Sequence, residues 1–210
     1  MFRLISATPS PYARKVRIAL AEKGLPFELI TEVPWDSTTT TPEFNPLEKL
    51  PILLLEDGTS VYDSRFILQY LEVKHPHPSL LPDDEDAALT ARKLEVLCDG
   101  VCDALVLTFF ERMRDEGGSP EWIARQRRKI DGGLREIARI VGNRQWAVGE
   151  RFSLGDIAAG TAVGYLSVRL PELDWRTLYP DLAALSDRLE ERCSFRESVP
   201  YAQPISDKVV

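Results

Sequence analysis

The sequence has few of the residues that metal-binding and redox proteins use. Its 210 residues include three cysteines, an odd number, and two histidines. Cys98 and Cys102 lie four residues apart in a helical pattern without a histidine ligand nearby, so we interpret both as small hydrophobic residues of a core. His75 and His77 lie in a proline-rich stretch and belong to no recognisable site pattern. We therefore predict no metal site and no catalytic histidine.

The sequence also lacks an excess of positive charge and long apolar runs. Lys and Arg number 26 against 33 Asp and Glu, and the net charge of −7 argues against a nucleic-acid partner, because phosphates require basic patches. No apolar run approaches the roughly 20 residues that a membrane span requires. The N-terminal stretch shows no basic segment followed by an apolar run, the pattern of a secretory signal, so we expect a cytoplasmic protein.

The N-terminal part of the sequence alternates between strand and helix spacing. We expect a strand over residues 2–6, a helix over 11–24 and a second strand over 27–33. An irregular loop over 34–46, a hairpin over 51–63 and a helix over 64–75 are expected to follow. Asp57 and Gly58 between two apolar runs predict the hairpin turn. The strand–helix–strand order at the start predicts two parallel strands in one sheet. Together these segments predict a compact α/β layer with a mixed sheet.

The remainder of the sequence is helical. Residues 78–86 are rich in proline and acidic side chains, which is typical of a linker between domains. Apolar residues then recur at spacings of three and four. The expected helices cover residues 87–115, 120–141, 154–170 and 180–193. Ser153 and Asp156 have the spacing of a capping box, and we assign both to folding. We predict an α/β domain over 1–77, a linker over 78–86 and an all-helical domain over 87–210.

This two-domain plan, together with four sequence motifs, resembles the glutathione S-transferases. The motifs are SPYARKVRIALAEKG, FNPLEKLPIL, VYDSRFILQYL and FSLGDIAAG, and the resemblance covers the whole chain. Within the family the sequence is most similar to bacterial YibF-like proteins, and its start is similar to the serine-type theta and zeta classes. The resemblance implies a thioredoxin-like N-terminal domain followed by an all-α helical C-terminal domain.

The resemblance also implies that Ser10 is the catalytic residue, with its hydroxyl facing the sulfur of glutathione. A thiol with a pKa near ~8.5 is little ionised at neutral pH, although the thiolate is the nucleophile. One hydrogen bond from a hydroxyl to a charged acceptor contributes roughly 1.5–3 kcal/mol, enough to lower that pKa by one to two units. The helix N-terminus and Arg14 would add to the effect. Two alternatives remain: Ser10 only caps its helix, or Thr8 supplies the hydroxyl.

Five further residues are expected to bind glutathione through the same resemblance. Leu50 and Pro51 are expected to form a cis peptide, so that the backbone of Leu50 pairs with the cysteinyl part of glutathione. Lys49 is expected to meet the glycine carboxylate. Asp63 and Ser64, at the start of a helix, are expected to bind the amine and the carboxylate of the γ-glutamyl end, although either residue also suits an ordinary helix cap.

The resemblance implies a homodimeric transferase that uses glutathione as co-substrate and directs its thiolate at a small hydrophobic electrophile. Asp99 or Asp103 is expected to reach the glutathione of the partner subunit. One alternative is a zeta-like glutathione-dependent isomerase, but that class carries a Ser-Ser-Cys run where this sequence has Ser10, Pro11 and Tyr12. The other is a non-catalytic binding or regulatory module of the stringent starvation protein type, which tends to lose the hydroxyl and the glutathione anchors.

Overall fold

The protein, described by a computed structural model, divides into two compact units. The structure describes residues 1–207, except for the side chain of Glu116. Of the described residues, the first unit comprises 1–80 and 193–207, and the second comprises Leu81–Arg192. Among the described residues, no helix combines the length and the apolar character needed to cross a membrane.

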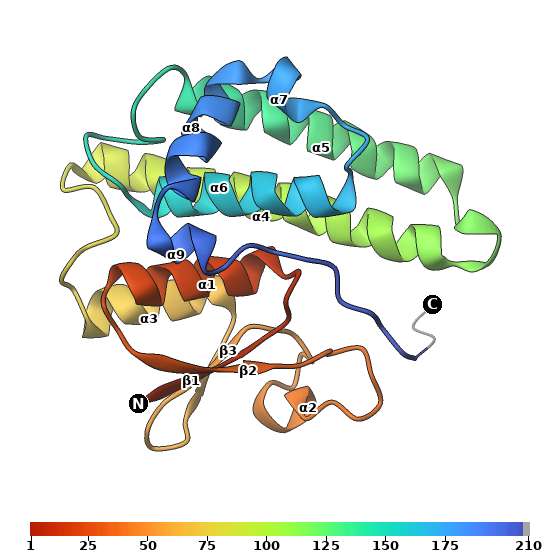
Figure 1. The fold of residues 1–210 in the computed structure, drawn as a ribbon, viewed down its shortest axis with the longest axis horizontal. Helices are drawn as coiled ribbons and strands as arrows, with labels where there is room; N and C mark the ends of the chain where they lie inside the picture. Colours follow the sequence, from red (N-terminus) through yellow and green to blue (C-terminus); the bar gives the residue numbers. More distant parts are fainter. Residues whose placement is uncertain (208–210) are drawn as a thin grey trace. The chain divides into compact units, whose positions relative to one another are not determined.

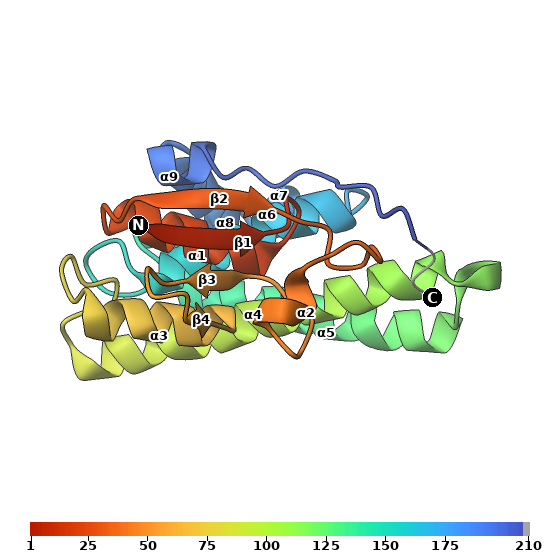
Figure 2. The ribbon, with the colours of Figure 1, turned by 90° about the horizontal axis from the view of Figure 1, so that it is seen from below.

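A four-stranded mixed sheet forms the base of the first unit, with strand order β2-β1-β3-β4 (Figure 2). The strands are β1 (Phe2–Ser6), β2 (Phe27–Thr31), β3 (Ile52–Leu54) and β4 (Ser60–Val61). β1 is parallel to β2 and antiparallel to β3, and β4 is antiparallel to β3. Gly58, in the turn between β3 and β4, has a φ of +87° that side chains disfavour. The predicted sheet and hairpin are confirmed.

Helices cover both faces of this sheet. They are α1 (Pro11–Glu22), α2 (Thr41–Phe44) and α3 (Ser64–Lys74). The fourth helix of the unit, α9 (Cys193–Arg196), packs against α1. Figure 1 shows α1 and α3 on one side of the strands and α2 on the other. On the α2 side, Ile5, Ile52 and Leu54 are buried and Phe44 of α2 packs against them. On the opposite face Leu4 and Leu53 are paired and buried as well, so helices cover apolar side chains on both faces. Each buried side chain of this size contributes about 1.5–3 kcal/mol.

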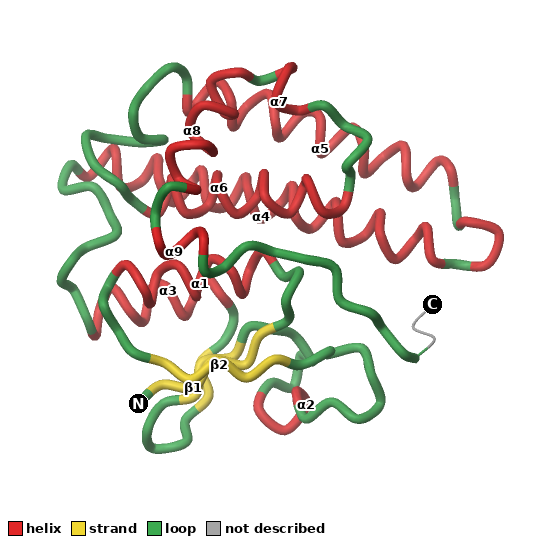
Figure 3. Tube along the Cα trace, in the orientation of Figure 1, coloured by secondary structure: helices red, strands yellow, loops and turns green. Residues whose placement is uncertain are grey.

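The C-terminal segment belongs to the first unit, whereas the sequence analysis assigned all of residues 87–210 to the helical domain. Helix α9 contacts α1, and the chain then continues as an irregular segment (Figure 3). The Arg14 guanidinium donates to the carbonyl of Phe195 at 3.2 Å, and Arg17 donates to the carbonyl of Glu197 at 2.7 Å. Carbonyls at a helix end have no helical partner and carry partial negative charge, which explains why two cations of α1 hold this segment.

The second unit is all helical. Its helices are α4 (Glu85–Met113), α5 (Pro120–Val141), α6 (Leu154–Arg169), α7 (Trp175–Leu178) and α8 (Pro180–Glu190), with a short 3₁₀ helix over Asp115–Gly117. Helix α4 packs against α5 and α6. Cys98 and Cys102 on α4 are buried, as predicted. The predicted capping box of Ser153 and Asp156 is also confirmed, at the start of α6.

Candidate functional site

Ser10 is the N-cap of α1. Its Oγ accepts a hydrogen bond from the backbone N–H of Ala13 at 3.2 Å, and Pro11 follows as the first helical residue, where its missing N–H costs nothing. This bond uses a lone pair of the hydroxyl and leaves its proton available for donation. A capping serine can therefore also donate to an anion, and the two interpretations of Ser10 are compatible.

Thr8, the alternative hydroxyl, faces the C-terminal segment. Its Oγ1 donates to the carbonyl of Tyr201 at 3.4 Å, and its backbone N–H donates to Oε1 of Gln203 at 3.3 Å. Arg14 is 2% exposed and its Nε donates to the hydroxyl of Ser198 at 3.4 Å, in addition to its bond with Phe195. These contacts give Arg14 a structural function within the first unit, and its contact with glutathione stays a prediction.

The peptide between Leu50 and Pro51 is cis, as the resemblance implied. The residues before it form a tight loop around the side chain of Asn45, which is 1% exposed. The Asn45 amide donates from Nδ2 to the carbonyl of Lys49 at 2.8 Å, and its Oδ1 accepts from the N–H of Leu47 at 3.0 Å. Asn45 thus holds the backbone that leads into Leu50. The side chain of Lys49 is exposed.

Asn45 is a candidate positioning residue that the sequence analysis missed. Its signal was the FNP in one of the four motifs, because a buried Asn before a proline is well suited to bridge a loop with both its amide donor and its carbonyl acceptor.

Asp63 is the N-cap of α3, and Ser64 is the first helical residue. The carboxylate of Asp63 accepts from the N–H of Arg65 at 3.0 Å and from that of Phe66 at 3.4 Å. Asp63 is exposed and Ser64 is 4% exposed. The carboxylate of Asp63 thus offsets the positive N-terminal end of α3, whereas α1 has no acidic residue at its cap or in its first turn.

Strand register brings these three segments to one edge of the sheet. The end of β1 leads toward Ser10, and Ile5 of β1 pairs with Ile52, which directly follows Pro51. In the next pair Leu53 of β3 is opposite Val61, so the chain after β4 runs back toward the same edge and reaches Asp63. The edge therefore combines a hydroxyl, a loop backbone and two helix N-termini, an arrangement suited to an extended ligand with anionic groups.

Asp99 and Asp103 lie on α4 in the second unit. Asp99 is 7% exposed, whereas Asp103 is exposed. Among the residues that the structure describes, no group of three or more His, Cys, Asp or Glu side chains is arranged to hold a metal ion.

Comparison with known proteins identifies matches over both units. The family model of the glutathione S-transferase N-terminal domain matches residues 9–74, and that of the C-terminal domain matches residues 120–188. A crystal structure of a glutathione S-transferase from Methylobacterium radiotolerans, in complex with glutathione sulfonate, is 73% identical. The match covers 100% of this chain and 99% of the Methylobacterium radiotolerans chain, with a TM-score of 0.98.

Two curated relatives add to this comparison. The GST-like protein YibF of Escherichia coli is 35% identical, over 94% of this chain and 98% of its own. A maleylacetoacetate isomerase of Pseudomonas aeruginosa is 28% identical, over 90% of this chain and 92% of its own.

Proposed function

This chain belongs to the glutathione S-transferase superfamily, and on that premise we propose that its first unit binds glutathione and that Ser10 stabilises the thiolate for attack on a small hydrophobic electrophile. The observation that carries the proposal is the meeting of Ser10, the cis Leu50–Pro51 peptide and the N-terminus of α3 at one edge of the sheet. The glutathione sulfonate complex of a protein that is 73% identical supports the choice of ligand.

Each residue at this edge has a proposed contact. The hydroxyl of Ser10 donates to the sulfur, and the backbone of Leu50 pairs with the cysteinyl residue as an added strand would. The backbone N–H and the hydroxyl of Ser64 bind the γ-glutamyl carboxylate. Asp63, whose carboxylate accepts from the N–H groups of Arg65 and Phe66, attracts the ammonium. Lys49, whose side chain is exposed, meets the glycine carboxylate. Once the thiolate lies beside a bound electrophile, proximity supplies most of the remaining acceleration.

We also propose a homodimer. Leu89, Val96 and Leu107 on α4 are 65%, 53% and 43% exposed, and their spacings of seven and eleven residues put them on one face of the helix. Asp103 falls on the same face, seven residues after Val96, so either it or Asp99 is the candidate to reach a partner's glutathione. Val96→Glu should convert a dimer to a monomer in light scattering, whereas Lys129→Glu, which changes an exposed cation on α5, should leave the dimer intact.

The proposal is tested by glutathione binding and conjugation together. Wild type should bind glutathione in calorimetry and conjugate it to an aryl halide. Ser10→Ala should bind glutathione within a few-fold of wild type but conjugate it about 10²-fold more slowly, while Ser10→Thr, which keeps the hydroxyl, should retain most of the rate. Failure of wild type to bind glutathione would contradict the proposal, and so would full activity of Ser10→Ala.

A glutathione-dependent isomerase is the second candidate, supported by the 28% identity to the Pseudomonas aeruginosa maleylacetoacetate isomerase. The departure at Pro11 and Tyr12 weighs against it. Turnover of maleylacetoacetate with glutathione, compared with aryl halide conjugation by the same preparation, decides between the two. Glutathione binding without either activity, and without thiolate formation, would instead favour the non-catalytic module.

A further inference from the structure

A cavity of about 390 Å³ opens in the first unit on the β2 side of the sheet. Its walls come from the ends of β1 and β2, from α1 and from the C-terminal segment, which Figure 2 shows along the β2 edge. The proposed glutathione site starts from the same end of β1, since Thr8 of the cavity wall is two residues before Ser10, but it extends toward the segments before β3 and after β4. The volume falls in the range of about 300–1,000 Å³ that small-molecule sites occupy.

The wall of this cavity carries two guanidinium groups. Its charged lining residues are Arg17 of α1, Arg196 of α9 and Glu197, two cations and one anion, which leaves a net positive charge. Arg17 donates to a neutral partner, the backbone carbonyl of Glu197. Burial and the neighbouring charge of Arg14 lower the pKa of Arg17. An anion beside Arg17 would offset the neighbouring charge of Arg14.

Large apolar side chains surround the same opening. Leu29, Val199 and Tyr201 all line the cavity, and they are 42%, 51% and 63% exposed. Grouped apolar exposure at a concave surface is typical of a binding site. A hydrated inorganic anion would leave these surfaces in water, whereas an organic anion with a flat apolar body would cover them.

We propose that this cavity binds a small aromatic carboxylate, at a place separate from the glutathione site. The carboxylate pairs with the guanidinium of Arg17, whose planar fork suits a two-oxygen acceptor. The ring lies against Leu29 and Tyr201. The inference rests on the cavity and its charges and is independent of the proposed transferase activity.

The test uses 1-naphthoate as probe, followed by backbone amide chemical shifts in the full chain. Thr31 lines the cavity and is exposed, so Thr31→Glu adds a carboxylate there while Thr31→Gln adds nearly the same volume without charge. Arg17→Gln removes the proposed partner. Arg3→Gln is its matched control, because Arg3 is exposed on β1 and points to the opposite face from Ser6, which lines the cavity.

Shifts are expected at Leu29, Thr31 and the first turns of α1, and they should persist when glutathione sulfonate is present in excess. Thr31→Glu and Arg17→Gln should each raise the Kd of 1-naphthoate about tenfold, and Thr31→Gln and Arg3→Gln should change it less than about twofold. The uncharged 1-naphthalenemethanol should bind more weakly than 1-naphthoate. Absence of shifts in the cavity, displacement by glutathione sulfonate, or equal binding by Thr31→Glu and Thr31→Gln would overturn the proposal.

Discussion

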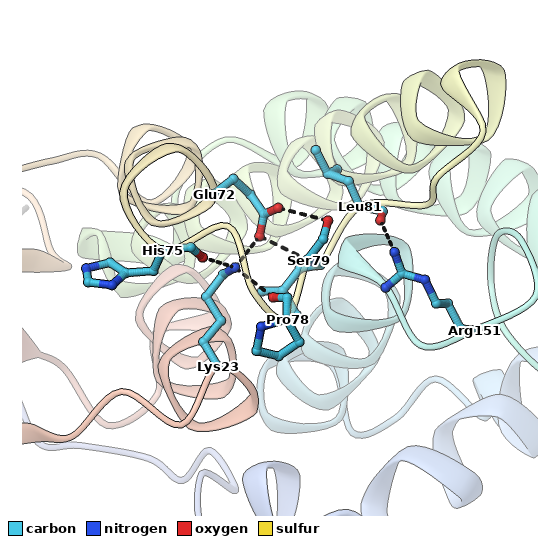
Figure 4. A network of polar contacts seen from close by, with 8 residues as sticks. Lys23, Glu72, His75, Pro78, Ser79, Leu81 and Arg151 are labelled. Atoms are coloured by element: carbon cyan, nitrogen blue, oxygen red, sulfur yellow. Dashed lines mark hydrogen bonds and ion pairs between the residues drawn. The ribbon is translucent and has the colours of Figure 1, made fainter.

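The Nζ of Lys23 lies 2.6 Å from Oε1 of Glu72, and the side chain of Lys23 is fully buried (Figure 4). Lys23 also donates to the carbonyls of His75 and Pro78 at 2.8 and 2.9 Å. Glu72 in turn accepts from the hydroxyl of Ser79 at 3.1 Å. This one ion pair therefore fastens the chain after α3 to the end of α1, within the first unit.

Lys23→Met should lower the free energy of unfolding by about 3 kcal/mol, because it leaves the largely buried carboxylate of Glu72 without its cation. Lys74→Met, an exposed lysine on the same unit, should change it by less than about 0.5 kcal/mol. Urea unfolding followed by circular dichroism measures both. Equal stability of the two variants would show that the ion pair does not hold the segment.

Gly133 on α5 lies against Val101 on α4, and a Cβ added there would come within 2.3 Å of the valine side chain. Gly133→Ala should therefore cost about 1–3 kcal/mol by overpacking. The neighbouring Gly132 has room for a Cβ, so Gly132→Ala should stabilise the helix by up to about 1 kcal/mol. Thermal unfolding of the two variants measures both changes. A Gly133→Ala variant that is more stable than wild type would contradict the close approach of Gly133 to Val101.

Burial raises the pKa of Asp156 from 3.8 to about 6, despite hydrogen bonds from Ala147 and Ser153. Because the folded value lies above the unfolded one, the stability that this group contributes is fully present below pH 3.8. This contribution, about 3 kcal/mol of the free energy of unfolding, is lost as the pH rises through about 6.

Comparison with Asp156→Asn isolates this effect, because the Asn side chain does not titrate. The other titratable groups are the same in both proteins, so their contributions cancel in the difference between the two free energies of unfolding. Guanidinium unfolding between about pH 4 and pH 7 gives the free energy of unfolding of both proteins. As the pH rises, the value for wild type should fall relative to that for Asp156→Asn. A difference that stays constant over this range would mean that Asp156 does not titrate in it.

Asn45→Asp should weaken glutathione binding by about fivefold to tenfold, because the carboxylate cannot donate to the Lys49 carbonyl and the loop before Leu50 loses one anchor. The effect should fall on KM rather than on kcat, since Asn45 acts through the loop. Asn143→Asp, a change of the same kind in the second unit, is the control. An unchanged KM in Asn45→Asp would show that Asn45 does not position the glutathione site.

Local pattern was enough to predict most of the first unit. The strand over residues 2–6, the Asp57-Gly58 turn and the helix from residue 11 each depend on neighbouring residues, and all three were confirmed. The burial of β1 does not alternate, because Leu4, Ile5 and Ser6 are all buried. The edge that gathers Ser10, Pro51 and Asp63 was foreseen through a family resemblance rather than through spacing, because strand register cannot be read from one sequence.

Long-range contacts account for what was missed. Arg14 was expected to help stabilise the thiolate, but its hydrogen bond and that of Arg17 extend to Phe195 and Glu197, about 180 residues away in sequence. A four-residue helix such as α9 has no periodicity to reveal it. The sequence thus showed the unusual charges of α1 but not the carbonyls that receive them.

The pKa of the glutathione thiol bound to the protein tests the central claim most directly, by ultraviolet absorbance of the thiolate across a pH series. The account predicts a wild-type value about two units below the ~8.5 of a free thiol, a rise of about one to two units in Ser10→Ala, and little change in Ser10→Thr. The same thiol pKa in wild type and Ser10→Ala would contradict it.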